Sequence, residues 1–285
     1  MSDNVNVRDI RTILTLERVE KNIFRGPSQD IGTPQVYGGQ VLGQAIAAAQ
    51  LTVEEDRPVH SAHAYFLRKG DFNAPIVYEV DRSREGRTFT ARRVVAIQHG
   101  KPIFTLAASF QAPEEGYEYQ APQVLPDFGA ALPLSEKERD PSRKDSIVRP
   151  INYFDVRVNP EPDPEDPNAL AFWVKTRQAL PDAADIHREV LAYVSDYGLL
   201  FSALVPHGYS MISSKGRSIS ELALASIDHA IWFHRPFRVD EWLYYRCVPI
   251  STAGSRGLAR GSVIDGQGRL VATTIQEGLM RKVSG

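Results

Sequence analysis

The stretches Tyr65-Phe66-Leu67-Arg68 and Trp232-Phe233-His234-Arg235 share one pattern of aromatic, apolar and basic residues, although they lie 167 positions apart (65 to 232). The same offset, kept without a gap, matches further positions of like character: Ile76 with Leu243, Tyr78 with Tyr245, Arg93 with Arg260, Ile97 with Ile264, and Ile103-Phe104 with Leu270-Val271. The matched positions fall on three consecutive runs with the pattern of strands. Self-similarity of this length predicts two copies of one structural unit rather than two unrelated domains.

The composition is that of an ordinary globular protein, with 42% hydrophobic and 24% charged residues among 285. The net charge of −2 argues against a nucleic-acid-binding protein, which would present a basic surface. A single cysteine, Cys247, excludes an internal disulfide and gives no indication of an oxidising compartment. Neither a signal peptide nor an apolar run of membrane-spanning length is evident in the sequence. We therefore expect a cytoplasmic protein without a membrane span.

Each copy combines one helix with several strands. In the first copy the Ala-rich segment 40–49 is small on nearly every face, which is typical of a helix enclosed by protein. Strand patterns follow at 59–67, 76–82, 88–98 and 103–111, with glycines between them. In the second copy we expect strands at 151–158 and 170–177, a helix at about 183–204, and strands at 224–233, 241–249, 257–264 and 270–281.

These elements predict an N-terminal repeat at 1–112, a proline-rich and charged linker at 113–150, and a C-terminal repeat at 151–285. A sheet with one apolar face needs a helix to cover it, and a sheet wrapped around a central helix is the hotdog fold. We predict an α+β tandem double hotdog, in which two antiparallel sheets are each wrapped around a central helix and paired edge to edge. Edge pairing would hide strands that otherwise invite aggregation. A two-layer α+β protein without a functional site fits the same periodicity.

Three polar residues are present in the second copy and missing from the first. With an offset of 157 for the helices, Gly39 lies opposite Asp196; in the strands, Val59 lies opposite Ser226 and Ser109 opposite Gln276. A carboxylate can accept a proton from an attacking water, and a hydroxyl and an amide can orient that water. The N–H groups at a helix N-terminus can stabilise the oxyanion that forms. The plainer alternative is that Asp196 caps a helix break, and that Ser226 and Gln276 are ordinary strand residues.

Seven segments, in order between about residues 16 and 281, form one specific set: Phe24-Arg25-Gly26, Tyr37-Gly38-Gly39-Gln40-Val41-Leu42-Gly43-Gln44-Ala45, His60-Ser61-Ala62-His63-Ala64-Tyr65-Phe66-Leu67-Arg68, Ala91-Arg92-Arg93-Val94, Ala108-Ser109-Phe110-Gln111, Ser226-Ile227-Asp228-His229-Ala230-Ile231-Trp232-Phe233-His234-Arg235-Pro236-Phe237, and Thr274-Ile275-Gln276-Glu277-Gly278-Leu279-Met280-Arg281. Together they closely resemble the acyl-CoA thioesterase II family. The resemblance implies a double hotdog that hydrolyses fatty acyl-CoA to free fatty acid and CoA without a cofactor. The family's catalytic Asp, hydroxyl and Gln fall on Asp196, Ser226 and Gln276. Many members carry Thr where Ser226 stands, the segment around Asp196 matches least well, and the linker hardly matches.

Other polar residues are candidates for binding the substrate. Arg92, Arg93, Arg256 and Arg260 could meet the phosphates of CoA, although exposed strand arginines are commonly solvated. Gly39 permits a close approach at the helix start, and His63 is the histidine best placed to reach the helix of its copy. The histidines do not form a closed ligand set with a cysteine, so we expect no metal. Asp228 and His229 are adjacent in a strand and point to opposite faces, and Cys247 matches the apolar Val80, so neither a dyad nor a thiol nucleophile is expected.

Two other functions remain open. A hotdog enoyl-CoA hydratase needs a helix Asp followed within a few residues by His, but Asp196 is followed by Tyr197-Gly198-Leu199-Leu200-Phe201. A non-catalytic acyl-CoA-binding protein would not need the polar set.

The run Trp242-Leu243-Tyr244-Tyr245 has apolar side chains on both faces of its strand. A sheet with one buried face requires apolar side chains on that face alone. We therefore expect a homodimer or a tetramer.

Overall fold

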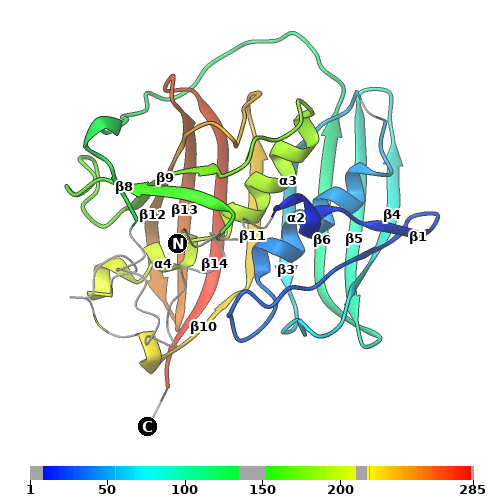
Figure 1. The fold of residues 1–285 in the computed structure, drawn as a ribbon, viewed down its shortest axis with the longest axis horizontal. Helices are drawn as coiled ribbons and strands as arrows, with labels where there is room; N and C mark the ends of the chain where they lie inside the picture. The colour runs from blue at the N-terminus through cyan, green and yellow to red at the C-terminus, as the bar shows by residue number, and fades with distance from the viewer. Residues whose placement is uncertain (1–8, 55, 135–151, 210–216, 218, 284–285) are drawn as a thin grey trace, which may run out of the picture.

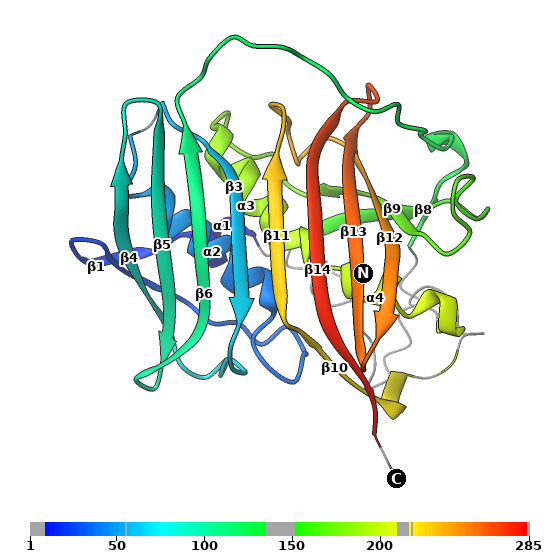
Figure 2. The same ribbon diagram turned by 180° about the vertical axis from the view of Figure 1, so that it is seen from behind.

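The computed structural model describes residues 9–54, 56–134, 152–209, 217 and 219–283 (Figure 1). Residues 135–150 of the predicted linker lie outside the described residues. The described chain forms one large sheet of 14 strands with its main helices on one face, as Figures 1 and 2 show from opposite sides. Within the described ranges, no helix is long and apolar enough to cross a membrane.

The first repeat contains the elements that the sequence predicted, together with a short helix, α1, and a short hairpin, β1–β2, that it did not predict. Its elements are α1 (Arg11–Leu14), β1 (Glu17–Glu20), β2 (Ile23–Gly26), α2 (Gly38–Gln50), β3 (Val59–Phe66), β4 (Ile76–Glu85), β5 (Phe89–Gln98) and β6 (Lys101–Gln111). The helix α2 is buried along almost its whole length, as its small side chains predicted. The added hairpin β1–β2 extends the sheet beside β4.

The second repeat has the same order of long strands, with two interruptions. Its elements are η1 (Phe128–Ala130), β7 (Leu132–Pro133), β8 (Phe154–Val158), β9 (Leu170–Thr176), α3 (Ala184–Ser195), α4 (Leu199–Ser202), η3 (Val205–His207), η4 (Ile219–Glu221), β10 (Leu222–Ser226), β11 (Asp228–Phe233), β12 (Leu243–Ala253), β13 (Arg256–Asp265) and β14 (Leu270–Lys282). The single helix expected at 183–204 is therefore wrong, because it is broken between α3 and α4. The strand expected at 224–233 is interrupted at Ile227, whose N–H donates to the carbonyl of Glu277.

The two repeats join edge to edge through β3 and β11, which confirms the predicted double hotdog. The strand order is β1-β2-β4-β5-β6-β3-β11-β14-β13-β12-β9-β8-β7, and β10 pairs separately with β14. His63 lies opposite Ala230, its own counterpart at the offset of 167. A local two-fold axis thus passes near this pair, as in the self-complementary interface of a symmetric dimer.

Strand register corrects one of the sequence matches. Arg92 pairs with Ala108 in the first repeat, whereas Ala259, the counterpart of Arg92, pairs with Gln276. The true counterpart of Gln276 is therefore Ala108 and not Ser109. The β13–β14 hairpin is one residue longer than the two-residue turn between β5 and β6, and this shifts the offset in β14 to 168.

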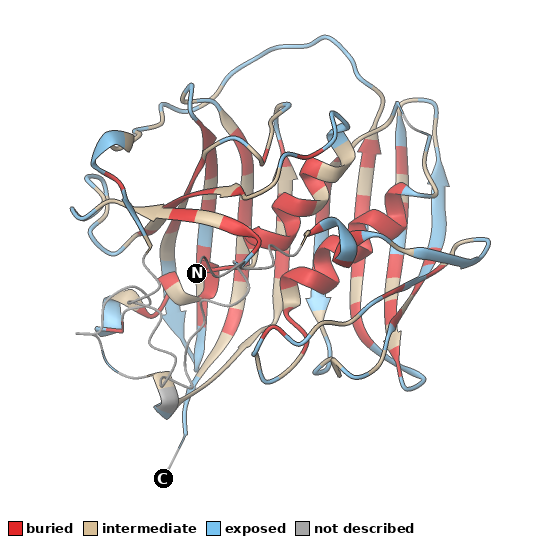
Figure 3. Ribbon diagram, in the orientation of Figure 1, coloured by how far each residue is buried: buried red, intermediate tan, exposed pale blue. Residues whose placement is uncertain are grey.

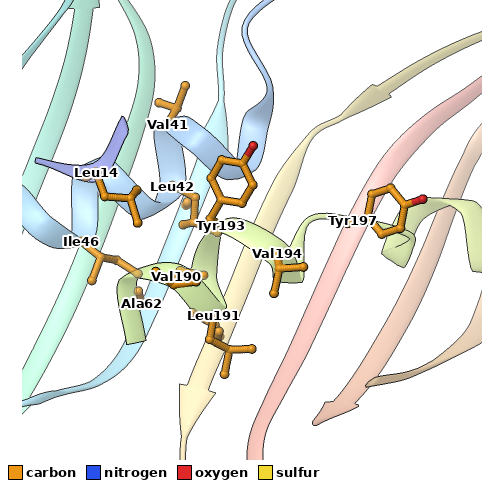
Figure 4. Packing of buried hydrophobic residues seen from close by; sticks show 14 of the residues in the cluster. Leu14, Val41, Leu42, Ile46, Ala62, Val190, Leu191, Tyr193, Val194 and Tyr197 are labelled. Carbon is orange, nitrogen blue, oxygen red and sulfur yellow. The ribbon is translucent and has the colours of Figure 1, made fainter. Parts of the chain in front are cut away.

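The helices α2 and α3 pack directly against each other in the centre of the molecule (Figures 3 and 4). Two glycines of α2 make this contact close. A Cβ atom on Gly39 would lie 2.1 Å from the carbonyl oxygen of Tyr193, and one on Gly43 would lie 3.0 Å from that of Glu189. The two helices therefore run antiparallel, so that the first turn of α2 meets the last turn of α3.

The outer face of the second sheet is partly covered by the same chain. Trp173, Tyr244 and Ile264 form a buried cluster there with Ala131, from the segment that was predicted to be a linker. Tyr244 is only 3% exposed. The apolar side chains of Trp242–Tyr245 on this outer face are thus partly covered by residues of the same chain. Their presence alone therefore does not require a second subunit.

Candidate active site

Asp196, Ser226 and Gln276 meet at one point, although they come from three separate elements. The Gln276 side-chain Nε2 in β14 donates to Asp196 Oδ1 at 2.6 Å and to Ser226 Oγ at 2.8 Å. Ser226, at the end of β10, donates to the same Asp196 oxygen over a longer 3.4 Å. The structure therefore brings together the three residues singled out by the comparison of the repeats.

The break between α3 and α4 sets the position of Asp196. Asp196 is the C-cap of α3, and Gly198 adopts a left-handed φ of 82° before α4 begins. Glycine adopts this conformation without the steric cost that other residues incur. The plainer alternative from the sequence, a capped helix break, is thus present, and the same residue also carries the carboxylate of the cluster.

The first repeat contributes its helix terminus to this site. The backbone N–H of Gly39 donates to the Asp196 carboxylate. A Cβ atom on Gly38 would lie 2.7 Å from Asp196 Oδ2, so a side chain there would collide with the carboxylate. Gly38 was not singled out from the sequence, although the Gly-Gly pair before an Ala-rich helix was the signal that could have identified it. Gly39, predicted to bind substrate, is placed as a donor to the carboxylate.

Opposing influences act on the pKa of Asp196. Burial raises the pKa above its ordinary value, while the hydrogen bonds from Gln276, Gly39 and Ser226 lower it in part. The carboxylate is consequently a stronger proton acceptor than an exposed aspartate. The Gln276 side-chain Oε1 is buried and has no hydrogen-bond partner among the described residues, so it can accept a hydrogen bond from the O–H of a water molecule.

The four candidate arginines and His63 lie away from this cluster. Arg92 is buried, and its guanidinium donates to Thr52, Glu85 and backbone carbonyls, which leaves no free N–H for a phosphate. Arg92 therefore holds the end of α2 against the sheet, and the structure contradicts its predicted contact with CoA phosphates. Arg93, Arg260 and His63 are exposed and share one row of paired strand positions on the face opposite the helices. Arg256, also exposed, pairs with Glu277 at 2.9 Å.

A cavity of about 450 Å³ lies elsewhere in the first repeat. Its lining includes Leu51 and Thr52, which follow the last residue of α2, and Arg82 of β4. Asp196 faces the opposite end of α2. This cavity is therefore separate from the polar cluster.

Other titratable side chains of the described residues are further candidates for a site. No three His, Cys, Asp or Glu side chains of the described residues lie close enough to hold a metal ion. Asp228 accepts a hydrogen bond from the Glu277 N–H, whereas His229 is buried on the other face against Ser195. Burial raises the pKa of the Cys247 thiol, which suits a core residue and not a nucleophile.

Comparison with known proteins identifies the family. The profile of the acyl-CoA thioesterase N-terminal domain matches residues 24–111, and that of the acyl-CoA thioesterase C-terminal domain matches residues 126–280. The chain belongs to the acyl-CoA thioesterase II family. Acyl-CoA thioesterase 2 of Haemophilus influenzae is 40% identical over 99% of both chains. Human acyl-coenzyme A thioesterase 8 is 35% identical over 95% of this chain and 88% of its own length.

Solved structures agree with this assignment. The acyl-CoA thioesterase II TesB2 from Mycobacterium marinum has a TM-score of 0.82 and 38% identity, and the match covers 97% of this thioesterase and 100% of that chain. The dehydratase domain of RzxB from Pseudomonas fluorescens covers 91% of this chain and 94% of its own, with a TM-score of 0.56 and 9% identity. At that identity the likeness shows a shared fold alone.

Proposed function

We propose that this thioesterase hydrolyses fatty acyl-CoA with a water molecule activated by Asp196 and oriented by Ser226 and Gln276. The observation that carries the assignment of residues is the Gln276 amide, which bonds to both the carboxylate and the hydroxyl. One donor group thereby fixes the proton acceptor and a second polar group relative to each other. Such preorganisation reduces the entropy lost when the water is captured.

The proposed reaction needs only these protein groups. Asp196 takes a proton from water as the water oxygen attacks the thioester carbon. The start of α2 lies against the same carboxylate through Gly39, and a helix N-terminus in this place is suited to stabilise the oxyanion of the tetrahedral intermediate. Collapse of the intermediate breaks the C–S bond and releases the CoA thiolate, which takes up the proton held by Asp196. The products are the free fatty acid and CoA.

An assay separates this function from its alternatives. The purified protein is incubated with a panel of acyl-CoA and enoyl-CoA substrates and a thiol-reactive dye. A thioesterase releases free CoA, which the dye detects. A hydratase removes the enoyl absorbance without releasing a thiol, and an acyl-CoA-binding protein changes neither signal. Absence of thiol release across the panel would overturn the proposed function.

The cellular setting and the assembly are also proposals. The sole cysteine, Cys247, is a buried free thiol, which supports a cytoplasmic location. A homodimer or a tetramer is supported by the outer face of the central strands, where Tyr65 is 58% exposed next to the His63–Trp232 ring pair. A second copy of the chain could cover these rings.

A further inference from the structure

The polar difference between the repeats extends beyond the three site residues. At five positions, strand register matches a buried apolar residue of the first repeat with a polar or smaller residue of the second: Val59 with Ser226, Ala62 with His229, Val94 with Gly261, Leu106 with Thr274, and Ala108 with Gln276. Ser226 and Gln276 bond to Asp196. Among the described residues, His229, Gly261 and Thr274 are not hydrogen-bond partners of Asp196, so their change needs a separate explanation.

These residues converge on Ser195, the last residue of α3 and the neighbour of Asp196. The Tyr245 hydroxyl donates to the Ser195 carbonyl at 2.7 Å. Because this uses the single hydroxyl hydrogen of Tyr245, the Thr274 hydroxyl, 2.9 Å away, donates to Tyr245. A Cβ atom on Gly261 would lie 2.2 Å from Thr274 Oγ1 and 2.8 Å from the Tyr245 hydroxyl. Gly261 thus leaves the space that the Tyr245–Thr274 pair occupies.

His229 forms a hydrogen bond with the side chain of Ser195. The Ser195 hydroxyl donates to the Ala192 carbonyl at 2.9 Å, so it can only accept from His229 Nε2, which lies 3.0 Å away. His229 therefore carries a hydrogen on Nε2, and burial, which lowers its pKa to about 3, favours the neutral ring. Ser195 is bound through both its carbonyl and its hydroxyl, immediately before the carboxylate.

The first repeat offers a natural comparison. Tyr78 is the counterpart of Tyr245, and its hydroxyl also bonds to the central helix of its own repeat, but through the Gln44 side chain at 2.6 Å. Both tyrosines are buried. Only Tyr245 bonds to the backbone beside Asp196.

We infer that Tyr245, Thr274 and His229 are positioning residues, which fix the backbone at Ser195 so that the Asp196 carboxylate stays aligned with Gln276 and Ser226. This inference rests on the proposed catalytic role of Asp196. A displacement of about 1 Å in a catalytic group can cost about 100-fold in rate. The last carbonyls of a helix have no partner within the helix, and the Ser195 carbonyl at the end of α3 obtains its partner from the Tyr245 hydroxyl.

The test compares Tyr245→Phe with Tyr78→Phe. Each variant removes one buried hydroxyl that bonds to a helix, so both are expected to lower Tm to a similar extent. We expect Tyr245→Phe to lower kcat by roughly 10–100-fold with little change in KM. Tyr78→Phe should keep the kcat of the parent protein. Equal kcat values in the two variants would overturn the inference.

The pH–rate profile gives a second readout that loss of stability alone would not move. The hydrogen bonds from Gln276, Gly39 and Ser226 lower the pKa of Asp196, so misalignment weakens them and moves the acid limb to higher pH. Among the described residues, the phenols of Tyr37, Tyr193 and Tyr245 also interact with Asp196, and they stay protonated because burial raises their pKa values. An acid limb at the same pH in Tyr245→Phe and Tyr78→Phe would contradict the inference.

Further variants and a structure separate this inference from the proposed function. Should Tyr245→Phe not fold, Thr274→Val removes the support of the Tyr245 hydroxyl and should give the same changes. At His229, Gln can still donate to Ser195 and should retain more activity than Leu. A crystal structure of Tyr245→Phe should show an Asp196–Gln276 distance longer than the present 2.6 Å, whereas Tyr78→Phe keeps it. This distance is measured without any activity, so an unchanged distance refutes the positioning role, whereas a parent protein that releases no CoA refutes the proposed function.

Discussion

Asp196 is a carboxylate whose surroundings act on its pKa in opposite directions. Burial raises the pKa above its ordinary value, and the hydrogen bonds from Gln276, Gly39 and Ser226 lower it in part. The same hydrogen bonds hold the carboxylate in a fixed orientation. The pKa of a general base is best when it lies near the working pH.

Replacement of Asp196 by Asn should remove the base and preserve the shape of the side chain. We expect Asp196→Asn to lower kcat by roughly 10²–10⁴, the usual effect of losing a general base. Glu189→Gln is a matched control, because Glu189 is another acid of α3 whose pKa burial raises, to about 8, and it lies outside the polar cluster. Steady-state kinetics measure kcat of both variants, and circular dichroism shows whether each is folded. Near-parental turnover in folded Asp196→Asn protein would refute the mechanism.

Gln276→Glu should damage the site through charge and not through size. The new carboxylate removes the donor to Asp196 and places a like charge beside it, so the pKa of Asp196 rises further. The acid limb of kcat/KM should therefore move to higher pH, and activity at pH 7 should fall. An acid limb that stays where it is in the parent protein would exclude Gln276 from the site.

Ser226 orients the water and is not itself the nucleophile. Its hydroxyl bonds to Gln276 and Asp196, and His229 on the next strand bonds to Ser195 instead, so no histidine base serves Ser226. We expect Ser226→Ala to lose about tenfold in kcat, the equivalent of one hydrogen bond, and Ser226→Thr to keep most of it. Mass spectrometry of the parent protein during turnover should find no acyl adduct on Ser226. Detection of one would favour a covalent route.

At this scale the sequence predicted the members of the polar cluster but not the roles of its other candidates. Asp196, Ser226 and Gln276 could be found because the two repeats differ there while the rest of the pattern agrees. Gln276 was matched to Ser109 because a one-residue difference in a hairpin leaves no trace in a weak overlay. Arg92 could not be recognised as buried, because its hydroxyl partner Thr52 lies 40 residues away and Glu85 reaches it from the neighbouring strand β4.

The contact between α2 and α3 is the element on which the site depends. It brings the N-terminus of one repeat's helix to the carboxylate of the other, and it requires a glycine at position 39. We expect Gly39→Ala to separate the helices, to lower Tm, and to reduce kcat because the Gly39 donor moves away from Asp196. Gly266→Ala is the control, since a Cβ atom there meets nothing within 4 Å. Equal Tm and kcat in the two variants would show that the close contact is dispensable.

The elements differ in how far the sequence could predict them. The long strands and α2 were predicted because alternation and small side chains are local signals. The break at Gly198 entered only as an alternative to one helix over 183–204, because that segment has helix-favouring residues on both sides of a single glycine. The interruption at Ile227 was missed because its backbone groups bond to two different strands, through Glu277 and Phe66, and only the assembled sheet shows this.

The whole molecule follows from one repeated unit and its local two-fold axis. Edge pairing was predictable, because each repeat alone would leave a long strand unpaired. The cover over the second sheet was not, because the segment 113–134 has no period that indicates where it packs. Its Phe128 and Ala131 lie against Trp173, so apolar residues attributed to a subunit interface are partly buried by their own chain.

The remaining exposed rings near the two-fold axis determine what we expect of the assembly. Tyr65 and the His63–Trp232 pair lie on the outer face of β3 and β11, where the described chain leaves them accessible. We expect light scattering at micromolar concentration to give a dimer or a tetramer of the 31.7 kDa chain. Tyr65→Arg should shift the mass toward the monomer, because it places a charge in the proposed contact, whereas Ile250→Arg, another exposed apolar position, should not. A fully active parent protein that scatters as a monomer would show that the chain covers its own apolar surface sufficiently.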